Sequence, residues 1–419
     1  MKGLIKTLAL MAALGFSHTA WAEDGAGANP SDNFPYLTGD WGGERAKLVN
    51  AGIDLQANYT ADYWSNLSGG IRTGSTFQDN LDLTMALDGE KLYGLQGSKV
   101  WVYFLNNSGS EFNKKHVGSG EGVDNIEVNT QTFKLFEAWV EQNFWGDAVS
   151  LRAGLYNLNS EFDATESSAI FLNPTYGIDT AFAGTGVNGP SIFPTSSLAA
   201  RLKITPTEKT YIMGAILDGV PGSPTNPHGT HIHLGDKDGM LVTAEAGYGD
   251  LDGGRIGIGG WRYSAKSDHL SQVDDDGNPV REHSHGAYII MEKSLYHPGG
   301  DADRHLDGFI RFARGNEEVN QFLYSGSIGL AYTGPFESRK EDVAGITFHG
   351  AKNGGPYRSA AIVGGSPVET GEWGIETTYS AKIMPWMSIQ PDFQYIRSPG
   401  TNPAIEEAVI AGLRTKISF

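Results

Sequence analysis

Residues 406–419 read EEAVIAGLRTKISF, and this stretch decides the fold class. Apolar side chains alternate along it with a second set that carries two cations, and the chain stops on an aromatic residue. Strands of a membrane barrel need this period of two, because lipid-facing and lumen-facing side chains alternate. The two sets are Val409, Ala411, Leu413, Ile417 and Phe419 against Ile410, Gly412, Arg414, Lys416 and Ser418.

The same alternation recurs upstream and predicts about sixteen strands. It is clear over 53–63, where Ile53, Leu55 and Ala57 alternate with Asp54 and Gln56. The other predicted strands lie near 80–88, 98–105, 131–145, 148–158, 197–205, 210–218, 240–248, 254–264, 284–294, 305–314, 320–333, 342–352, 370–382, 386–397 and 406–419.

The connections between these strands alternate in length. Short turns are expected at 88–90, 146–147, 206–208 and 384–385, and long polar loops at 106–130, 159–196, 219–239, 265–283 and 353–369. Short turns at one end and long loops at the other are typical of an outer-membrane barrel. An even strand count places both termini on the periplasmic side. The alternative, a soluble β-sandwich or solenoid, leaves the loop asymmetry unexplained.

The first residues have the pattern of a secretory signal peptide over 1–22. Lys2 and Lys6 precede an apolar run, and Ala20-Trp21-Ala22 reads as a cleavage site. Losing both lysines takes the formal net charge from −18 to −20, which disfavours nucleic acid as a partner. Residues 23–51 form a leader in which 41–50 is expected to be a short helix, with Asp40 as its N-cap. The barrel itself is expected over 52–419.

Composition supports the same class of protein. Glycine accounts for 56 of 419 residues and aromatic residues for 11%, which favours short strands and turns over long helices. Cysteine is absent, which excludes disulfides and thiolate chemistry and suits passage through an oxidising periplasm.

Several separate motifs resemble the OprB family of carbohydrate-selective porins. They begin with LTGDWGGER at 37–45 and continue with EAWVEQ at 137–142, RAGLYN at 152–157, GPSIFP at 189–194, QPD at 390–392 and GLR at 412–414. The resemblance implies a sixteen-stranded barrel in the Gram-negative outer membrane. It also implies passive entry of glucose and related sugars, without a cofactor or enzymatic activity.

The hairpin around Gly146-Asp147 permits a prediction of which side chains face the lumen. A type II′ turn there sets Glu141 opposite Arg152 and Trp139 opposite Gly154. Aromatic faces can cover the C–H patches of a sugar, while charged groups replace the water on its hydroxyls. The alternative role is a cross-strand ion pair that braces the wall. The predicted pore-lining residues are Glu137, Trp139, Glu141, Arg152 and Tyr156, together with Asp62, Asp82 and Glu376.

The connection over 159–196 is long and rich in aromatic residues, including Phe162, Phe171 and Tyr176. We expect it to fold into the barrel and narrow the pore, the alternative being a packed external lid. The short leader helix is expected either to close the periplasmic mouth or to pack inside the wall.

Two loops resemble metal sites but fail on spacing. His228, His231 and His233 match no zinc pattern. In the stretch from Asp274, Pro279 occupies the position where an EF-hand requires glycine. No metal site and no catalytic residues are therefore predicted.

The leading hypothesis is sugar-selective diffusion, with monosaccharides such as glucose as solutes and outer-membrane lipid around the barrel. A general or cation-leaning porin is the second hypothesis, argued from the net charge. An outer-membrane hydrolase is the third, and it lacks any recognisable catalytic motif. The barrel is expected to be a monomer or a homotrimer.

Overall fold

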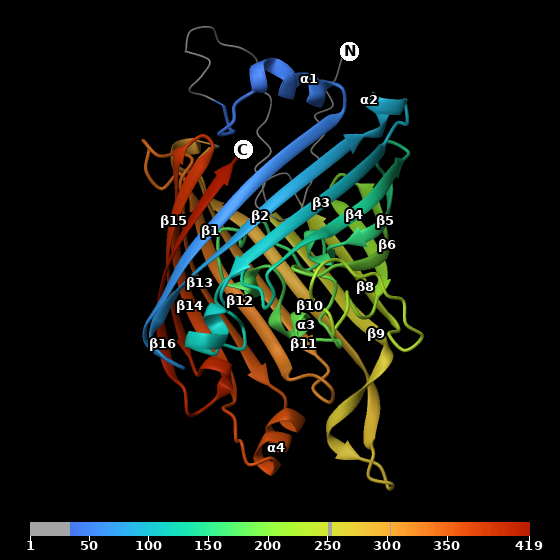
Figure 1. Ribbon diagram of the computed structural model, residues 1–419, viewed down its shortest axis with the longest axis vertical. Helices are drawn as coiled ribbons and strands as arrows, with labels where there is room; N and C mark the ends of the chain where they lie inside the picture. The colour runs from blue at the N-terminus through green and yellow to red at the C-terminus, as the bar shows by residue number, and fades with distance from the viewer. Residues whose placement is uncertain (1–33, 250–253, 302) are drawn as a thin grey trace.

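The computed structural model describes residues 34–249, 254–301 and 303–419, so the expected signal peptide at 1–22 lies outside the described residues. The described chain forms a closed antiparallel barrel in which each strand pairs with its neighbours in sequence, and the last strand pairs with the first (Figure 1). The sixteen strands expected from the alternation are confirmed. They are β1 Ile53–Gly70, β2 Gly74–Asp88, β3 Ser98–Gly109, β4 Thr132–Phe144, β5 Val149–Tyr156, β6 Ser197–Thr207, β7 Thr210–Asp218, β8 Met240–Gly249, β9 Gly254–Val273, β10 Pro279–Tyr296, β11 His305–Gly315, β12 Phe322–Thr333, β13 Val343–Asn353, β14 Gly371–Met384, β15 Met387–Arg397 and β16 Glu406–Ser418.

The barrel closes because β16, the strand formed by the C-terminal stretch described above, pairs with β1. Asp62 on β1 is directly opposite Arg414 on β16, and Tyr63 is opposite Leu413. Arg414 is buried on the inner face, whereas Leu413 is exposed on the outer one. The alternation read from the sequence therefore sorts these side chains correctly between lumen and lipid.

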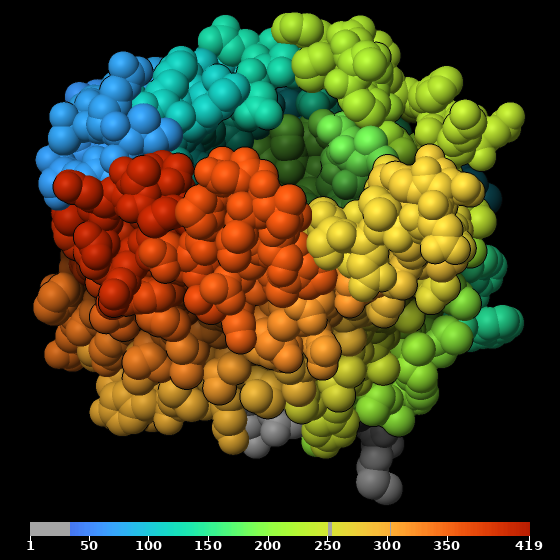
Figure 2. Space-filling model, turned by 90° about the horizontal axis from the view of Figure 1, so that it is seen from below, coloured from blue at the N-terminus to red at the C-terminus, as the bar shows by residue number. Residues whose placement is uncertain are grey.

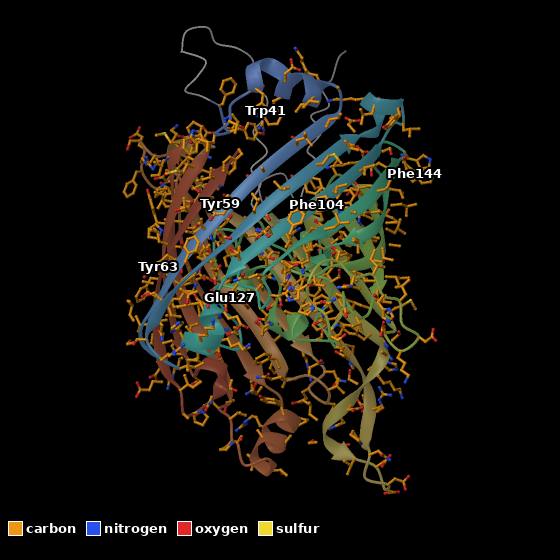
Figure 3. All side chains as sticks on the ribbon, in the orientation of Figure 1. Trp41, Tyr59, Tyr63, Phe104, Glu127 and Phe144 are labelled. Carbon is orange, nitrogen blue, oxygen red and sulfur yellow. The ribbon has the colours of Figure 1, made fainter. Side chains whose placement is uncertain are left out.

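Apolar and aromatic side chains cover the outer surface. Tyr63, Phe104 and Phe144, which Figure 3 labels on the barrel wall, are all exposed. A barrel in lipid needs such an outer face, with aromatic residues concentrated near both interfaces. Among the described residues, no helix has the length and apolar character to cross a membrane.

The leader forms a short helical segment at the end of the barrel where β16 ends (Figure 1). A 3₁₀ turn, Trp41–Gly43, leads into α1 Glu44–Asn50. Asp40 precedes the turn, and its carboxylate accepts a hydrogen bond from the Ala46 amide at 3.2 Å. The Arg45 guanidinium donates to the carbonyl oxygen of Phe419 at 2.9 Å and lies over the Tyr36 ring at 3.8 Å. The helix thus holds the end of β16 at the periplasmic mouth.

Two local expectations were wrong. The segment after Asp88 is a helix, α2 Gly89–Tyr93, which Asp88 caps. Residues 265–283 are mostly strand, because β9 and β10 continue past the barrel as a protruding hairpin (Figure 1). The expected long connection over 353–369 is present between β13 and β14, and it contains a helix that was not predicted, α4 Gly355–Val363.

The turn between β4 and β5 also differs from the predicted type II′ turn. Its backbone has positive φ at Trp145, Gly146 and Asp147, whereas a type II′ turn needs positive φ only at its first central residue. The predicted register survives this error, since Glu141 is opposite Arg152 and Trp139 is opposite Gly154.

Candidate functional site

The connection between β5 and β6, residues 157–196, lies inside the barrel, and we call it the inner loop. Its backbone is held by charged side chains that point inward from distant strands. Glu376 on β14 accepts from the amides of Leu172 at 2.5 Å and Asn173 at 3.1 Å. Glu245 on β8 accepts from the Asp163 amide at 3.0 Å. The inner loop therefore crosses the interior from the β5–β6 wall to the opposite one.

Arg311 on β11 fixes the middle of the inner loop. Its guanidinium donates to the carbonyl oxygens of Asp163, at 2.7 Å, and Tyr176. It also lies 3.1 Å from the Asp163 carboxylate and 3.8 Å from that of Asp179. These groups are all fully or almost fully buried. A buried cation with this many acceptors strongly specifies one loop conformation.

The aromatic residues of the inner loop pack against the inner face of the wall. Phe182 stacks on Trp261 of β9 with ring centroids 4.2 Å apart, and Phe171 lies 5.8 Å from the Phe309 ring. Figure 2, which looks onto the end bearing the long loops, shows a hollow with green segments of chain inside it. The inner loop thus occupies part of the barrel's interior, and the hollow at this end of the barrel lies beside it (Figure 2).

A second inner loop, residues 110–131 between β3 and β4, also folds inward, and the sequence did not reveal this. Asp124 accepts from the Trp64 indole at 2.9 Å and pairs with Arg414 at 2.7 Å. Glu121 contacts His349 on β13 at 3.1 Å. The sequence showed two acidic residues, Glu121 and Asp124, in a long loop, but it did not indicate which side chains they would contact.

The wall formed by β3, β4 and β5 carries an aromatic–basic cluster of Lys99, Trp101, Trp139 and Arg152. The two indoles stack with centroids 6.1 Å apart. The Arg152 guanidinium lies 3.9 Å from the Trp139 ring centroid, and the Lys99 ammonium lies 5.7 Å and 5.9 Å from the two indoles. Such distances are typical of cation–π contacts.

Strand register explains why these four side chains meet. Lys99 is opposite Glu141 and Trp101 is opposite Trp139, so β3 places a second cation and a second indole at the height of the predicted hairpin. Gly154 faces Trp139 with positive φ, and an added Cβ would lie 2.6 Å from the Trp139 Cα. A side chain there would displace the strand or the indole.

Glu161 of the inner loop ties this wall together. It pairs with Arg152 at 3.1 Å and with Arg201 on β6 at 2.8 Å, while Lys203 lies 3.9 Å away. Glu141 pairs with the same two arginines. Burial disfavours ionisation of Glu161, but the charges of Arg152 and Arg201 outweigh it and lower its pKa to about 2. The loop carboxylate is therefore charged and fixed between two cations.

The eight predicted pore-lining residues all lie on the inner face, in two different settings. Glu137, Tyr156, Asp62 and Glu376 are buried, and they contact loop segments or neighbouring strands. Glu137, for example, accepts from the Asn157 amide at 2.9 Å. Glu141, Arg152 and Asp82 are partly exposed. Trp139 is also buried, with 7% of its surface exposed, and it packs against Trp101 and Arg152 in the aromatic–basic cluster. The buried carboxylates and Tyr156 hold the interior together, and the three partly exposed residues are the candidates for direct solute contact.

Asp82 lies in a polar patch on β2, away from the hairpin. Its carboxylate accepts from the Tyr103 hydroxyl at 2.6 Å and also from the side-chain amide nitrogen of Asn80. The side-chain amide nitrogen of Asn107 on β3 donates to the side-chain oxygen Oδ1 of Asn80 at 2.5 Å. Tyr103, Asn80 and Asn107 are buried, so the patch is an internal hydrogen-bond network on β2 and β3, and Asp82 is its partly exposed member.

Among the residues that the structure describes, no group of three or more His, Asp or Glu side chains is placed to hold a metal ion. His228, His231 and His233 lie in the loop between β7 and β8. The His231 ring is within 2.8 Å of the His228 carbonyl oxygen.

Comparison with known proteins places this geometry in one family. The family model described as "Carbohydrate-selective porin, OprB family" matches residues 72–419. Porin B of Pseudomonas aeruginosa is 24% identical over 448 residues, covering 98% of this chain and 96% of that protein. The putative porin QuiX of Acinetobacter baylyi is 20% identical over 457 residues, covering 100% of this chain and 98% of that protein.

Solved structures show the same fold. The high-pH structure of Pseudomonas putida OprB superposes with a TM-score of 0.84 at 22% identity, covering 94% of this chain and 100% of that one. The low-pH structure of the same protein gives a TM-score of 0.61 at 19% identity, with 93% and 100% coverage.

Proposed function

Because the chain belongs to the OprB family of carbohydrate-selective porins, we propose that its solutes are monosaccharides, glucose and related sugars, which diffuse passively into the periplasm. The protein is an outer-membrane channel and not an enzyme. The choice of glucose-like sugars rests on the chemistry of the inner wall.

The aromatic–basic cluster is the observation that carries this proposal. A pyranose ring has apolar C–H faces and a rim of hydroxyl groups. Trp101 is partly exposed and stacks on the buried Trp139, so Trp101 is the indole that can meet a sugar and Trp139 supports it. Lys99, Glu141 and Arg152 supply donors and acceptors on the same wall. Contacts of this kind are individually weak, and a channel needs weak contacts so that the solute leaves as easily as it enters.

Charge on this wall also favours a neutral solute. Lys99, Arg152 and Arg201 are set against the carboxylates of Glu141 and Glu161, which are already paired with the two arginines. A pore selective for one ion sign would present a ring of that charge. Mixed, largely paired charge provides many polar contacts with only a modest field along the channel.

A general or cation-leaning porin remains the second candidate, because the chain has a formal net charge of −18. Against it, several interior carboxylates are occupied in holding loops. Glu376 binds backbone amides of the inner loop, and Asp62 is paired with Arg414 at 2.6 Å. Because these carboxylates are already hydrogen-bonded or ion-paired within the protein, they contribute little unpaired negative charge to the lumen.

Liposome swelling distinguishes the two candidates. Liposomes containing the purified protein should admit glucose faster than a zwitterionic amino acid of similar size, and sugar should reduce the ionic current through single channels. Equal swelling rates without current block would reduce the protein to a general porin. A reversal potential in a KCl gradient that strongly favours K⁺ would select the cation-leaning alternative.

A further inference from the structure

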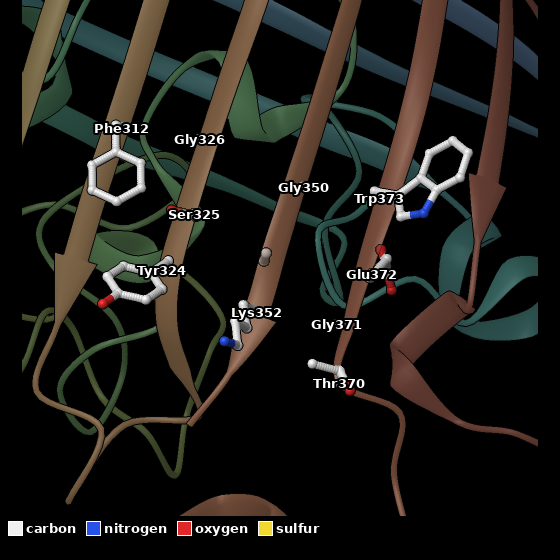
Figure 4. Close-up of a pocket in the computed structure, with 11 residues that line it drawn as sticks. Phe312, Tyr324, Ser325, Gly326, Gly350, Lys352, Thr370, Gly371, Glu372 and Trp373 are labelled. Carbon is white, nitrogen blue, oxygen red and sulfur yellow. The ribbon is translucent and has the colours of Figure 1, made fainter. Parts of the chain in front are cut away.

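A groove of about 410 Å³ runs along the outer surface of β11 to β14, near the end that carries the long loops (Figure 4). Phe312 and Tyr324 form one side of it and Trp373 the other. Lys352 lies at its loop-side end. This face would contact the outer leaflet of the membrane, because the opposite end of the barrel carries the leader helix, the end of β16 and the short turns.

Two glycines create the floor of the groove. Gly326 and Gly350 are directly paired across β12 and β13, so two neighbouring strands lack an outward side chain at the same height. A Cβ added at Gly350 would lie 3.1 Å from the Trp373 Cβ, and one at Gly326 would lie 2.7 Å from the Arg311 carbonyl oxygen. The backbone spacing therefore favours glycine at both positions, and an apolar trough remains between aromatic walls.

Three exposed cations line the loop-side rim of this outer face. Arg314, Lys352 and Arg397 belong to β11, β13 and β15 and are all exposed. Arg314 lies 5.5 Å from the Tyr324 ring and Arg397 lies 5.8 Å from the Trp373 ring. Within the part of the chain that the structure describes, none of the three is in an ion pair. One exposed carboxylate, Glu407 on β16, borders the Arg397 side, next to the Ile396–Ala408 pair.

We propose that this face binds a phosphorylated lipid of the outer leaflet, with an acyl chain in the groove and its phosphate against Arg314, Lys352 and Arg397. The three cations outnumber Glu407, the exposed carboxylate that borders them, so this rim carries an excess of positive charge on a protein of net charge −18. A phosphate at the headgroup level provides the counter-charge. The trough below accepts the apolar part of the same molecule, and the aromatic rings lie at the interface between the two.

A second copy of the chain fits this face less well. A symmetric contact through the same patch would bring like cations together, and a copy of the same chain adds the same net negative charge elsewhere. A phospholipid or glycolipid phosphate avoids both difficulties.

A second outer groove, of about 540 Å³, is also largely apolar but differs from the first in its charge. It is lined by aliphatic residues such as Leu198, Ile216 and Leu234, and its charged member is Asp218. Among the described residues that line this second groove, none is a lysine or an arginine. Charge complementarity therefore singles out the groove on β11 to β14 as the site for an anionic lipid.

Native mass spectrometry of the purified full chain in detergent tests the proposal, with lipid A as the probe and its dephosphorylated form as the matched ligand. Combining R314Q, K352Q and R397Q should weaken lipid A binding about tenfold or more. The dephosphorylated lipid should bind the unchanged protein as weakly as lipid A binds the variant. The control K209Q removes an exposed lysine from the turn between β6 and β7 and should leave binding unchanged.

Single-channel conductance, which should not change in the triple variant, shows that the barrel is still folded. Equal binding of lipid A by the variant and the unchanged protein would overturn the proposal. So would a stable oligomer that buries this face and excludes lipid, which the same spectra would show by mass.

Discussion

The guanidinium of Arg152 lies 3.9 Å from the centre of the Trp139 indole ring. Glu141 and Glu161 pair with the same guanidinium at 2.8 Å and 3.1 Å. A cation held by two carboxylates and one aromatic face has little freedom to reorient. The wall of the channel is therefore preorganised before solute arrives, and several measurable consequences follow from its parts.

Replacing Glu161 by glutamine should make the channel more selective for anions. The substitution removes the loop carboxylate that lies between Arg152 and Arg201, while both cations stay in place. The permeability ratio of Cl⁻ to K⁺, measured from reversal potentials in a KCl gradient, should rise roughly threefold, which corresponds to about 0.7 kcal/mol. The control E208Q alters an exposed carboxylate in the turn between β6 and β7 and should not move the reversal potential.

Deleting residues 165–190 should raise single-channel conductance. This part of the inner loop lies against Arg311, Glu376 and Trp261 inside the barrel, so its removal widens the open cross-section. The exposed charges on the wall would then face water, which solvates them and lets the barrel persist. Unchanged conductance from a folded barrel would contradict an obstructing inner loop.

Replacing Arg414 by glutamine should destabilise the barrel where its ends meet. Arg414 is buried between the carboxylates of Asp62 and Asp124, at 2.6 Å and 2.7 Å. Removing the cation leaves two buried carboxylates uncompensated, which typically costs about 3–5 kcal/mol. Denaturant unfolding of the folded barrel measures the loss, and restoring neutrality with D62N and D124N in the same chain should recover part of it.

The second inner loop should loosen as pH rises. Burial raises the pKa of Glu127 to about 7, against the opposing effect of hydrogen bonds from the Asn113 amide. The folded loop therefore holds a proton that an unfolded one would lose from about pH 4.5 upward, so its stabilisation is full below that value and declines as pH approaches 7.

Hydrogen exchange measures this effect. Protection of the amides in 110–119, corrected for intrinsic exchange, should fall between about pH 5 and about pH 8. In an E127Q variant the side chain is neutral at both values, and the difference should disappear. A pH dependence that survives in E127Q would assign the effect to another group.

The strand count and the sorting of side chains between lipid and lumen could be predicted because the membrane imposes them. Each strand must alternate to satisfy both environments, as Leu413 and Arg414 do. The register between β4 and β5 could be predicted for a second reason, because a very short turn allows few alternative pairings of the two strands. The pairing of Glu141 with Arg152 was therefore predicted correctly, although the predicted turn type was wrong.

The contribution of β3 to the site could not be predicted. Lys99 and Trp101 alternate correctly within their strand, but a connection of more than twenty residues separates that strand from Trp139. The ladder also contains an irregularity between Tyr103 and Phe104. Register across a long loop with a bulge cannot be read from one sequence.

The contacts of the inner loops could not be predicted either, for a different reason. The aromatic content of 159–196 suggested a buried loop, but the acceptors for its backbone are carboxylates on strands far along the chain, such as Glu245 and Glu376. The protruding hairpin of β9 and β10 was missed because its sequence over 265–283 is polar and carries no clear alternation of apolar residues.

Single-channel current in the presence of glucose tests most directly whether the aromatic–basic cluster selects sugar. Glucose should block the current of the unchanged protein. The apparent affinity for glucose should fall about threefold to tenfold in W139A and in W101A, as expected for an aromatic contact worth about 0.5–1.5 kcal/mol. The exposed Trp145, in the turn between β4 and β5, provides the matched control W145A, which should behave like the unchanged protein. Glucose block that is the same in all four proteins would contradict a sugar-binding role for this wall.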